Sequence, residues 1–97
     1  MVINFPPGHR MTSQLLRAGI TALLNVTPGM RTKRPHIGMW HWQVSIDQSI
    51  DLHNEKDGSV TIWVSETLHD TAGLVIQSWL NDSTMQLAYD KAKEKHG

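Results

Sequence analysis

Residues 40–66 read WHWQVSIDQSIDLHNEKDGSVTIWVSE, and their large apolar side chains recur at every second position. Such alternation is typical of strands that bury one face. Residues 47–49 and 56–58 interrupt it with turn-forming residues, which predicts a three-stranded antiparallel meander. Because the alternation keeps its phase across 47–49, one long bent strand over 40–54 is the alternative to the first hairpin. Trp63 is the large exception to this alternation. Nine apolar residues of the stretch fall on even-numbered positions: Trp40, Trp42, Val44, Ile46, Ile50, Leu52, Val60, Ile62 and Val64.

The length of each turn determines which residues pair. Directly opposed residues of antiparallel strands point to the same face, so a register must pair apolar positions with one another. A three-residue loop at 56–58 pairs Leu52 with Ile62 and places Gly58 at the left-handed position that such loops need. A two-residue turn at 57–58 would instead pair Leu52 with Trp63 and divide the apolar face.

The same reasoning applies to the first hairpin. It predicts that Ile46 lies opposite Ile50 and that Val44 lies opposite Leu52. Ser49 would then occupy the loop position that glycine usually takes. We call the side of the sheet that carries these apolar residues the even face. The odd face is the opposite side, which carries His41, Gln43, Ser45, Asp51, His53, Thr61, Trp63 and Ser65.

Helical patterns flank the meander. A helix that begins after Thr12 or Ser13 has one narrow polar stripe, so we expect it to pack across the even face. After the sheet, one apolar face at helical spacing predicts a second helix, and Ser83 with Gln86 forms a capping box for a third. The expected fold is α+β with the order α-β-β-β-α-α. We expect a single domain over 1–97, divided into an N-terminal arm (1–10), a helix (11–26), a basic loop (27–39), the three-stranded sheet (40–66) and a helical region (67–96). The arm either adds an edge strand to the sheet or packs its apolar residues on the core.

Composition narrows the class of protein. The 97 residues contain no cysteine and no apolar run near ~18 residues, which excludes disulfides and a transmembrane helix. We therefore expect a cytoplasmic protein without membrane contact. The net charge is zero, but residues 1–46 carry five basic and no acidic side chains, whereas residues 47–97 carry nine acids and four lysines. The basic half either lies against the acidic half or offers a patch to an acidic partner.

Chemistry on the odd face is limited. His41, His53 and Asp51 are residue types that bind zinc, but their spacing matches no zinc pattern. An open sheet face also gives neither histidine a pocket for acid–base catalysis. We therefore expect no catalytic residue, no metal, no cofactor and no enzymatic activity.

A nucleic-acid-binding accessory protein is the alternative function. Arg31, Lys33 and Arg34 in the basic loop would contact phosphates, with Trp63 as a stacking residue. The element order resembles that of double-stranded-RNA-binding domains. These domains carry a lysine cluster at the start of the helix after the sheet, where this chain has Glu66, His69 and Asp70. Three phosphate contacts on a neutral domain predict only weak binding without sequence preference.

The main functional hypothesis is a small protein-binding module. Trp63 is the one tryptophan that the pattern puts on the odd face, and an exposed aromatic is typical of an interface anchor. The arm or the third helix covering Trp63 is the structural alternative. The partner is another protein or a second copy of the chain. Small, neutral, cysteine-free α+β proteins without motifs are common among phage-encoded inhibitors of host enzymes, anti-CRISPR proteins included, and this class analogy suggests such an inhibitor. The expected contact residues are Trp63, His41, Gln43, Asp51 and His53.

Overall fold

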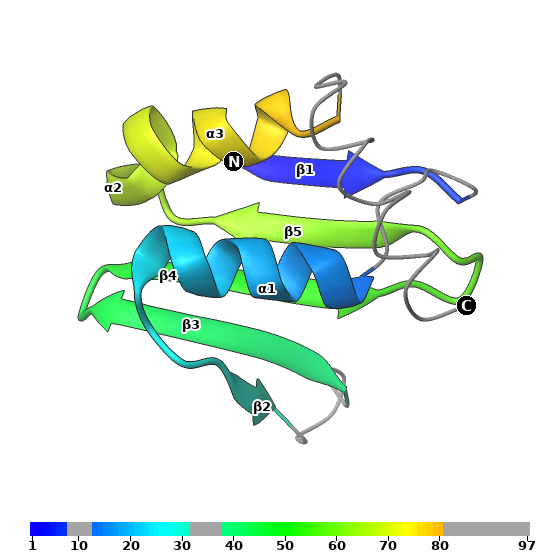
Figure 1. Cartoon of the computed structure of the whole chain (residues 1–97), viewed down its shortest axis with the longest axis horizontal. Coiled ribbons are helices and arrows are strands. Elements are labelled where there is room, and N and C mark those ends of the chain that lie inside the picture. The colour runs from blue at the N-terminus through cyan, green and yellow to red at the C-terminus, as the bar shows by residue number, and fades with distance from the viewer. Residues whose placement is uncertain (8–12, 32–37, 81–97) are drawn as a thin grey trace.

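A computed structural model describes residues 1–7, 13–31 and 38–80. The sheet has five antiparallel strands in the order β1-β5-β4-β3-β2 (Figure 1). After β5 the chain forms one continuous helical segment, in which a π-helical turn at His69–Gly73 joins two short α-helices. The strands are β1 (Val2–Phe5), β2 (Gly29–Arg31), β3 (Met39–Ser45), β4 (Gln48–Asn54) and β5 (Val60–Val64), and the helices are α1 (Ser13–Leu24), α2 (Glu66–Leu68) and α3 (Leu74–Ser78).

The expected three-stranded meander with the order α-β-β-β-α-α is wrong, although the fold is α+β. The first additional strand, β1, comes from the predicted arm and pairs with β5 at the far end of the sheet. The second, β2, comes from the predicted basic loop and pairs with β3. Three or four residues are too few to establish a period, so the alternation did not reveal either strand. The helix expected from Ser83 lies outside the described residues.

The predicted β4–β5 hairpin is confirmed. Leu52 lies opposite Ile62 and Ile50 lies opposite Val64. Gly58 has a φ of 91°, a conformation that residues with a Cβ rarely adopt. The loop closes with a hydrogen bond from the Gly58 amide to the Glu55 carbonyl.

The predicted register of the first hairpin is wrong, and so is the single long strand over 40–54. Leu52 lies opposite Trp40, and a bulge between Gln43 and Ser45 adds one residue before a tight turn at 46–47. The partner of Leu52 is thus four residues away from the predicted Val44, and alternation cannot detect a slip by an even number of residues, because such a slip keeps every side chain on its face. As a result, Val44 is 41% exposed and Ile46 is fully exposed, although both were expected in the core.

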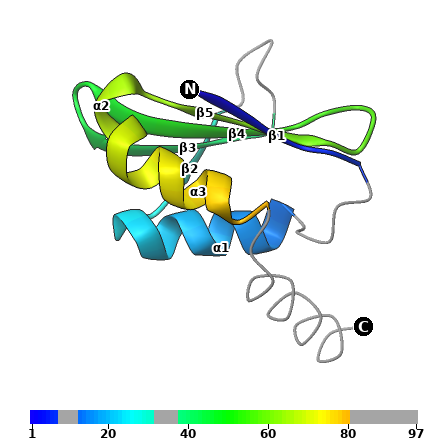
Figure 2. The same cartoon turned by 90° about the horizontal axis from the view of Figure 1, so that it is seen from above.

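The core lies between the even face and the helices (Figure 2). As predicted, α1 packs across this face, with Leu16 and Ile20 fully buried. Less of α1 is buried than its apolar composition suggested, since Leu23 remains exposed. The buried residues that form this core are Ile3, Phe5, Leu16, Ile20, Trp42, Ile50, Leu52, Val60, Ile62, Val64, Leu68, Ala72 and Ile76.

Both α1 and α3 lie on the same side of the sheet (Figure 2). None of the helices in the described ranges covers the odd face, so these helices bury only one side of the sheet. None of them is long and apolar enough to cross a membrane.

Candidate functional site

Strand pairing aligns one residue from each of the five strands in a row across the odd face, and all but the glycine of β2 have a side chain there. Val2 of β1 lies opposite Trp63 of β5, and Trp63 lies opposite Asp51 of β4. Asp51 in turn lies opposite His41 of β3, which lies opposite Gly29 of β2. Side chains of directly opposed residues share a face. The row therefore brings together residues that are far apart in sequence.

His41 of β3, one residue of this row, contacts two neighbouring side chains. Its Nδ1 lies 2.5 Å from Oδ1 of Asp51, and its Nε2 lies 2.8 Å from Oε1 of Gln43. The Gln43 amide nitrogen donates to the carbonyl of Ser45, which orients the amide oxygen toward His41. Both partners of the imidazole are thus acceptors, and both bonds form together when each ring nitrogen carries a proton.

Trp63 and His53 form a second group on the odd face. Trp63 is partly exposed, and its ring centroid lies 6.1 Å from that of His53 at an interplanar angle of 31°. Nδ1 of His53 lies 3.2 Å from Oε1 of Glu55, at the end of β4. His53 therefore contacts both the Trp63 ring and the carboxylate of Glu55.

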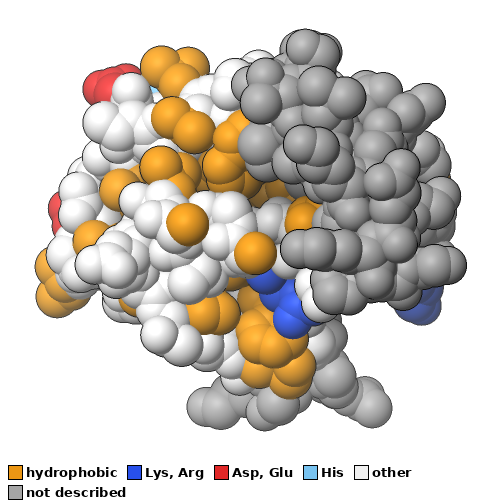
Figure 3. Space-filling model, in the orientation of Figure 1, with side chains coloured by type: hydrophobic (Ala, Val, Ile, Leu, Met, Phe, Trp, Pro, Cys, Tyr) orange, Lys and Arg blue, Asp and Glu red, His pale blue; other side chains and the backbone are white. Residues whose placement is uncertain are grey.

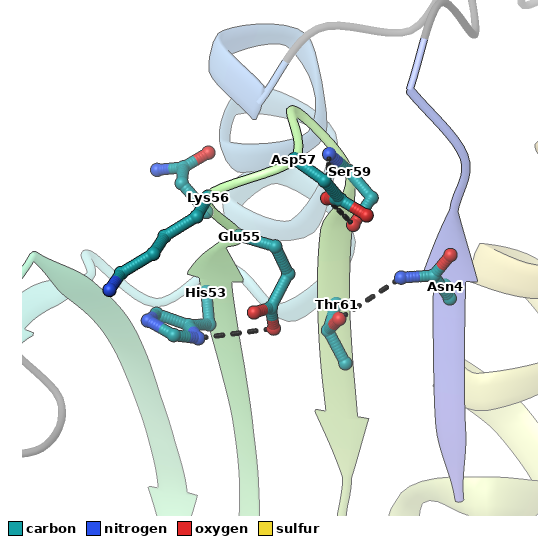
Figure 4. Close-up of a pocket in the computed structure, with 8 residues that line it drawn as sticks. Asn4, His53, Glu55, Lys56, Asp57, Ser59 and Thr61 are labelled. Carbon is teal, nitrogen blue, oxygen red and sulfur yellow. Dashed lines mark hydrogen bonds and ion pairs between the residues drawn. The ribbon is translucent and has the colours of Figure 1, made fainter.

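Next to His53, an open depression of about 760 Å³ lies where β4 and β5 meet their connecting loop (Figure 4). Glu55 reaches toward His53 on one side of it, while the amide nitrogen of Asn4 donates a 3.1 Å hydrogen bond to Oγ1 of Thr61 on the other. All the residues that line the depression are of polar or charged types. Its lining residues are Asn4, His53, Asn54, Glu55, Lys56, Asp57, Ser59 and Thr61.

Asp57 is positioned by the loop itself. The hydroxyl and the backbone amide of Ser59 both donate to Oδ1 of Asp57, at 2.6 and 2.9 Å. These bonds, the hydroxyl's most of all, hold the pKa of Asp57 below its ordinary value of 3.8. The carboxylate is therefore charged at neutral pH.

The five residues expected to contact a partner all lie on the odd face, but in two groups. His41, Gln43 and Asp51 form one group, and His53 with Trp63 forms the other. The two predicted registers together would place His53 between Gln43 and Thr61, but only Thr61 pairs with it, because Gln43 pairs with Ser49. This error follows directly from the wrong register of the first hairpin.

The sequence did not predict some residues of the odd face, and some predicted site residues lie outside the part of the chain that the structure describes. Asn4 and Val2 were missed because β1 reaches the sheet through a pairing about 60 residues away in sequence, which no local pattern reveals. Arg31 belongs to β2, where its backbone pairs with Met39. Lys33 and Arg34 lie outside the described residues. Within the described ranges, no three metal-binding side chains are grouped as a metal ion would require.

Apolar side chains also reach the surface on the helix-covered side (Figure 3). Leu74 and Val75 of α3 are 53% and 40% exposed, and Leu23 lies on α1. In Figure 3 the apolar atoms on this side form separate pieces among polar and backbone atoms. Singly exposed apolar residues of this kind are ordinary on protein surfaces. The odd face, with its aligned row, is the better candidate site.

No protein-family model, curated protein or solved structure matches this chain.

Proposed function

We propose that this chain is a non-enzymatic protein-binding module that acts through the odd face of its sheet. The row that crosses the sheet on a side without a described helix is the observation that carries this proposal. Trp63 stands in that row between Val2, which is 61% exposed, and Asp51. Protein interfaces commonly have an aromatic or apolar anchor residue at the centre and polar residues around it.

Pre-organisation of the neighbouring side chains supports this function. His41 is held by Asp51 and Gln43, and His53 is held by Glu55. Side chains that are ordered before binding lose less conformational entropy when a partner docks. The face therefore has both an anchor and a border of side chains that already contact polar partners.

The contacts of His41 favour recognition over catalysis. A general base needs a ring nitrogen within reach of the substrate, and both nitrogens of His41 already contact neighbouring side chains. The depression beside His53 is open, whereas catalytic pockets generally enclose their substrate. Inhibition of a host enzyme complex is the form of protein binding that the class analogy suggests, and the same face would carry it.

Affinity capture from the native host tests this function when it compares three baits. Wild type, Trp63→Ala and Leu74→Ala are immobilised at equal density after circular dichroism has shown that each is folded. Leu74 is the matched control, because it is exposed and apolar but lies on α3. We expect one protein to be retained by wild type and Leu74→Ala and lost with Trp63→Ala. Equal retention by all three baits would contradict a role for the odd face.

A further inference from the structure

We propose that the odd face recognises a basic segment of its protein partner, and that the depression beside His53 receives an arginine or lysine side chain of that segment. This inference rests on the proposed function and specifies the chemistry of the partner.

The first argument is charge. Glu55 and Asp57 contribute two carboxylates to the depression, and Lys56 contributes the one formal positive charge in its lining. Figure 4 shows the Lys56 side chain directed away from both carboxylates. Across residues 1–7, 13–31 and 38–80, no lysine or arginine forms an ion pair with either acid. The described lining residues therefore carry a net negative formal charge, which favours a positively charged group on a partner that fills the depression.

The second argument is the orientation of the acceptors. Asp57 receives both bonds from Ser59 on Oδ1, which leaves Oδ2 for a partner. Asn4 uses its amide nitrogen to donate to Thr61, which leaves its amide oxygen as an acceptor. Glu55 stands on the opposite side of the depression, next to His53. Several acceptors around one open space match the multiple N–H donors of a guanidinium or ammonium group.

The third argument is the apolar surface beside the acceptors. The His53 ring borders the depression, and the centroid of the Trp63 ring lies 6.1 Å from the centroid of the His53 ring. Arginine and lysine side chains lay their methylene stems along such rings while the charged end reaches a polar site. One basic side chain can therefore occupy the depression while its neighbours along the segment pack on Trp63.

These arguments disfavour the phosphate backbone of a nucleic acid as the occupant. Phosphates approach lysine and arginine clusters, and two carboxylates would repel them. A divalent cation is a different occupant that carboxylates also attract, so the test includes one.

The test is a titration of the ¹⁵N-labelled full chain with a tri-arginine peptide blocked at both ends, followed by two-dimensional NMR. A blocked tri-glutamate peptide is the control for the sign of the charge. With tri-arginine we expect saturable chemical-shift changes in the backbone amide signals of the residues that line the depression. With tri-glutamate we expect no saturable chemical-shift changes. Tri-arginine shifts that are spread evenly over the chain and do not saturate would overturn the proposal.

Two variants sharpen this titration. Glu55→Gln with Asp57→Asn removes both charges, and the asparagine oxygen can still accept the bonds from Ser59 that order the loop. We expect the double variant to bind tri-arginine at least tenfold more weakly. Asp70→Asn, which changes an acid with a 96% exposed side chain on the helical segment, should bind as wild type does. An unchanged affinity in the double variant, or the same shifts with Mg²⁺ or Ca²⁺ alone, would overturn the proposal.

The double variant also separates this inference from the proposed function. If the captured partner is lost with Trp63→Ala but retained in full with Glu55→Gln/Asp57→Asn, the odd face binds a protein and the basic-segment inference fails. If the partner is retained with Trp63→Ala, the proposed function itself fails. Loss of the partner with both variants is the result that we expect.

Discussion

The indole nitrogen of buried Trp42 donates a 3.0 Å hydrogen bond to the hydroxyl of Thr21, and this bond joins β3 to α1. The same hydroxyl donates to the carbonyl of Arg17, one helical turn earlier. A buried indole N–H without an acceptor is costly, so this polar contact fixes how α1 lies across the even face. The odd face is left uncovered by the described helices because both α1 and α3 are committed to the other side.

Removing the Thr21 hydroxyl should destabilise the fold. Thr21→Val keeps the shape of the side chain but leaves the Trp42 N–H unpaired in the core, which we expect to cost about 1–3 kcal/mol. Urea unfolding measures this change. Thr27→Val, at an exposed position after α1, is the control and should change stability little.

The close contact between Gly19 and Trp79 gives a second prediction. A Cβ at Gly19 would lie 2.8 Å from the nearest atom of the Trp79 ring, which is too close. Glycine to alanine inside a helix normally stabilises by about 0.5–1 kcal/mol, but here the indole must move, so we expect Gly19→Ala to destabilise by about 1 kcal/mol or more.

Introducing Gly19→Ala into a Trp79→Leu variant tests whether the Trp79 ring causes the expected loss of stability. In Trp79→Leu the obstructing ring is absent, so Gly19→Ala should become stabilising there. A stabilising Gly19→Ala in the wild-type background would show that the two residues do not pack as described.

The left-handed conformation of Gly58 predicts a loss of stability on substitution. Gly58→Val should cost on the order of 1–2 kcal/mol through backbone strain, because the nearest atom to an added Cβ is 3.7 Å away and leaves room for it. Gly29→Val is the matched control, since Gly29 has no atom within 4 Å of an added Cβ and no left-handed φ. Thermal melts in which both variants match wild type would contradict the three-residue loop.

Asp57 should make the stability of the fold depend on pH in the acid range. Its pKa is lower in the folded chain than the ordinary 3.8, so its stabilising effect is complete above that value and is lost as the pH falls through the folded pKa. We expect the stability difference between wild type and Asp57→Asn to stay constant near neutral pH and to shrink below about pH 4. Urea unfolding over this range measures it, and a difference that grows on acidification would have the wrong sign.

The parts of the fold that the sequence predicts are those that neighbouring residues determine. The β4–β5 register followed from alternation plus Gly58, because a short loop leaves few ways to pair the strands. The β3–β4 register did not follow, since the bulge and the turn at 46–47 preserve the alternation on which the prediction depended.

The candidate site divides in the same way. Alternation was sufficient to assign Trp63, His41, Gln43, Asp51 and His53 to one face. It could not bring Asn4 beside Thr61, because that contact depends on β1 pairing with β5 across most of the described chain. The depression was missed for this reason, as one of its sides comes from β1.

The most direct test of the central claim is the affinity of Trp63→Ala for the captured partner, measured by calorimetric titration on folded protein. If the odd face is the binding surface, the variant should lose about 2 kcal/mol or more of binding free energy and keep a melting temperature close to that of wild type. If Trp63 instead belongs to the core, the variant should lose roughly 3–5 kcal/mol of stability. Binding that is unchanged in a folded Trp63→Ala would contradict the proposed surface.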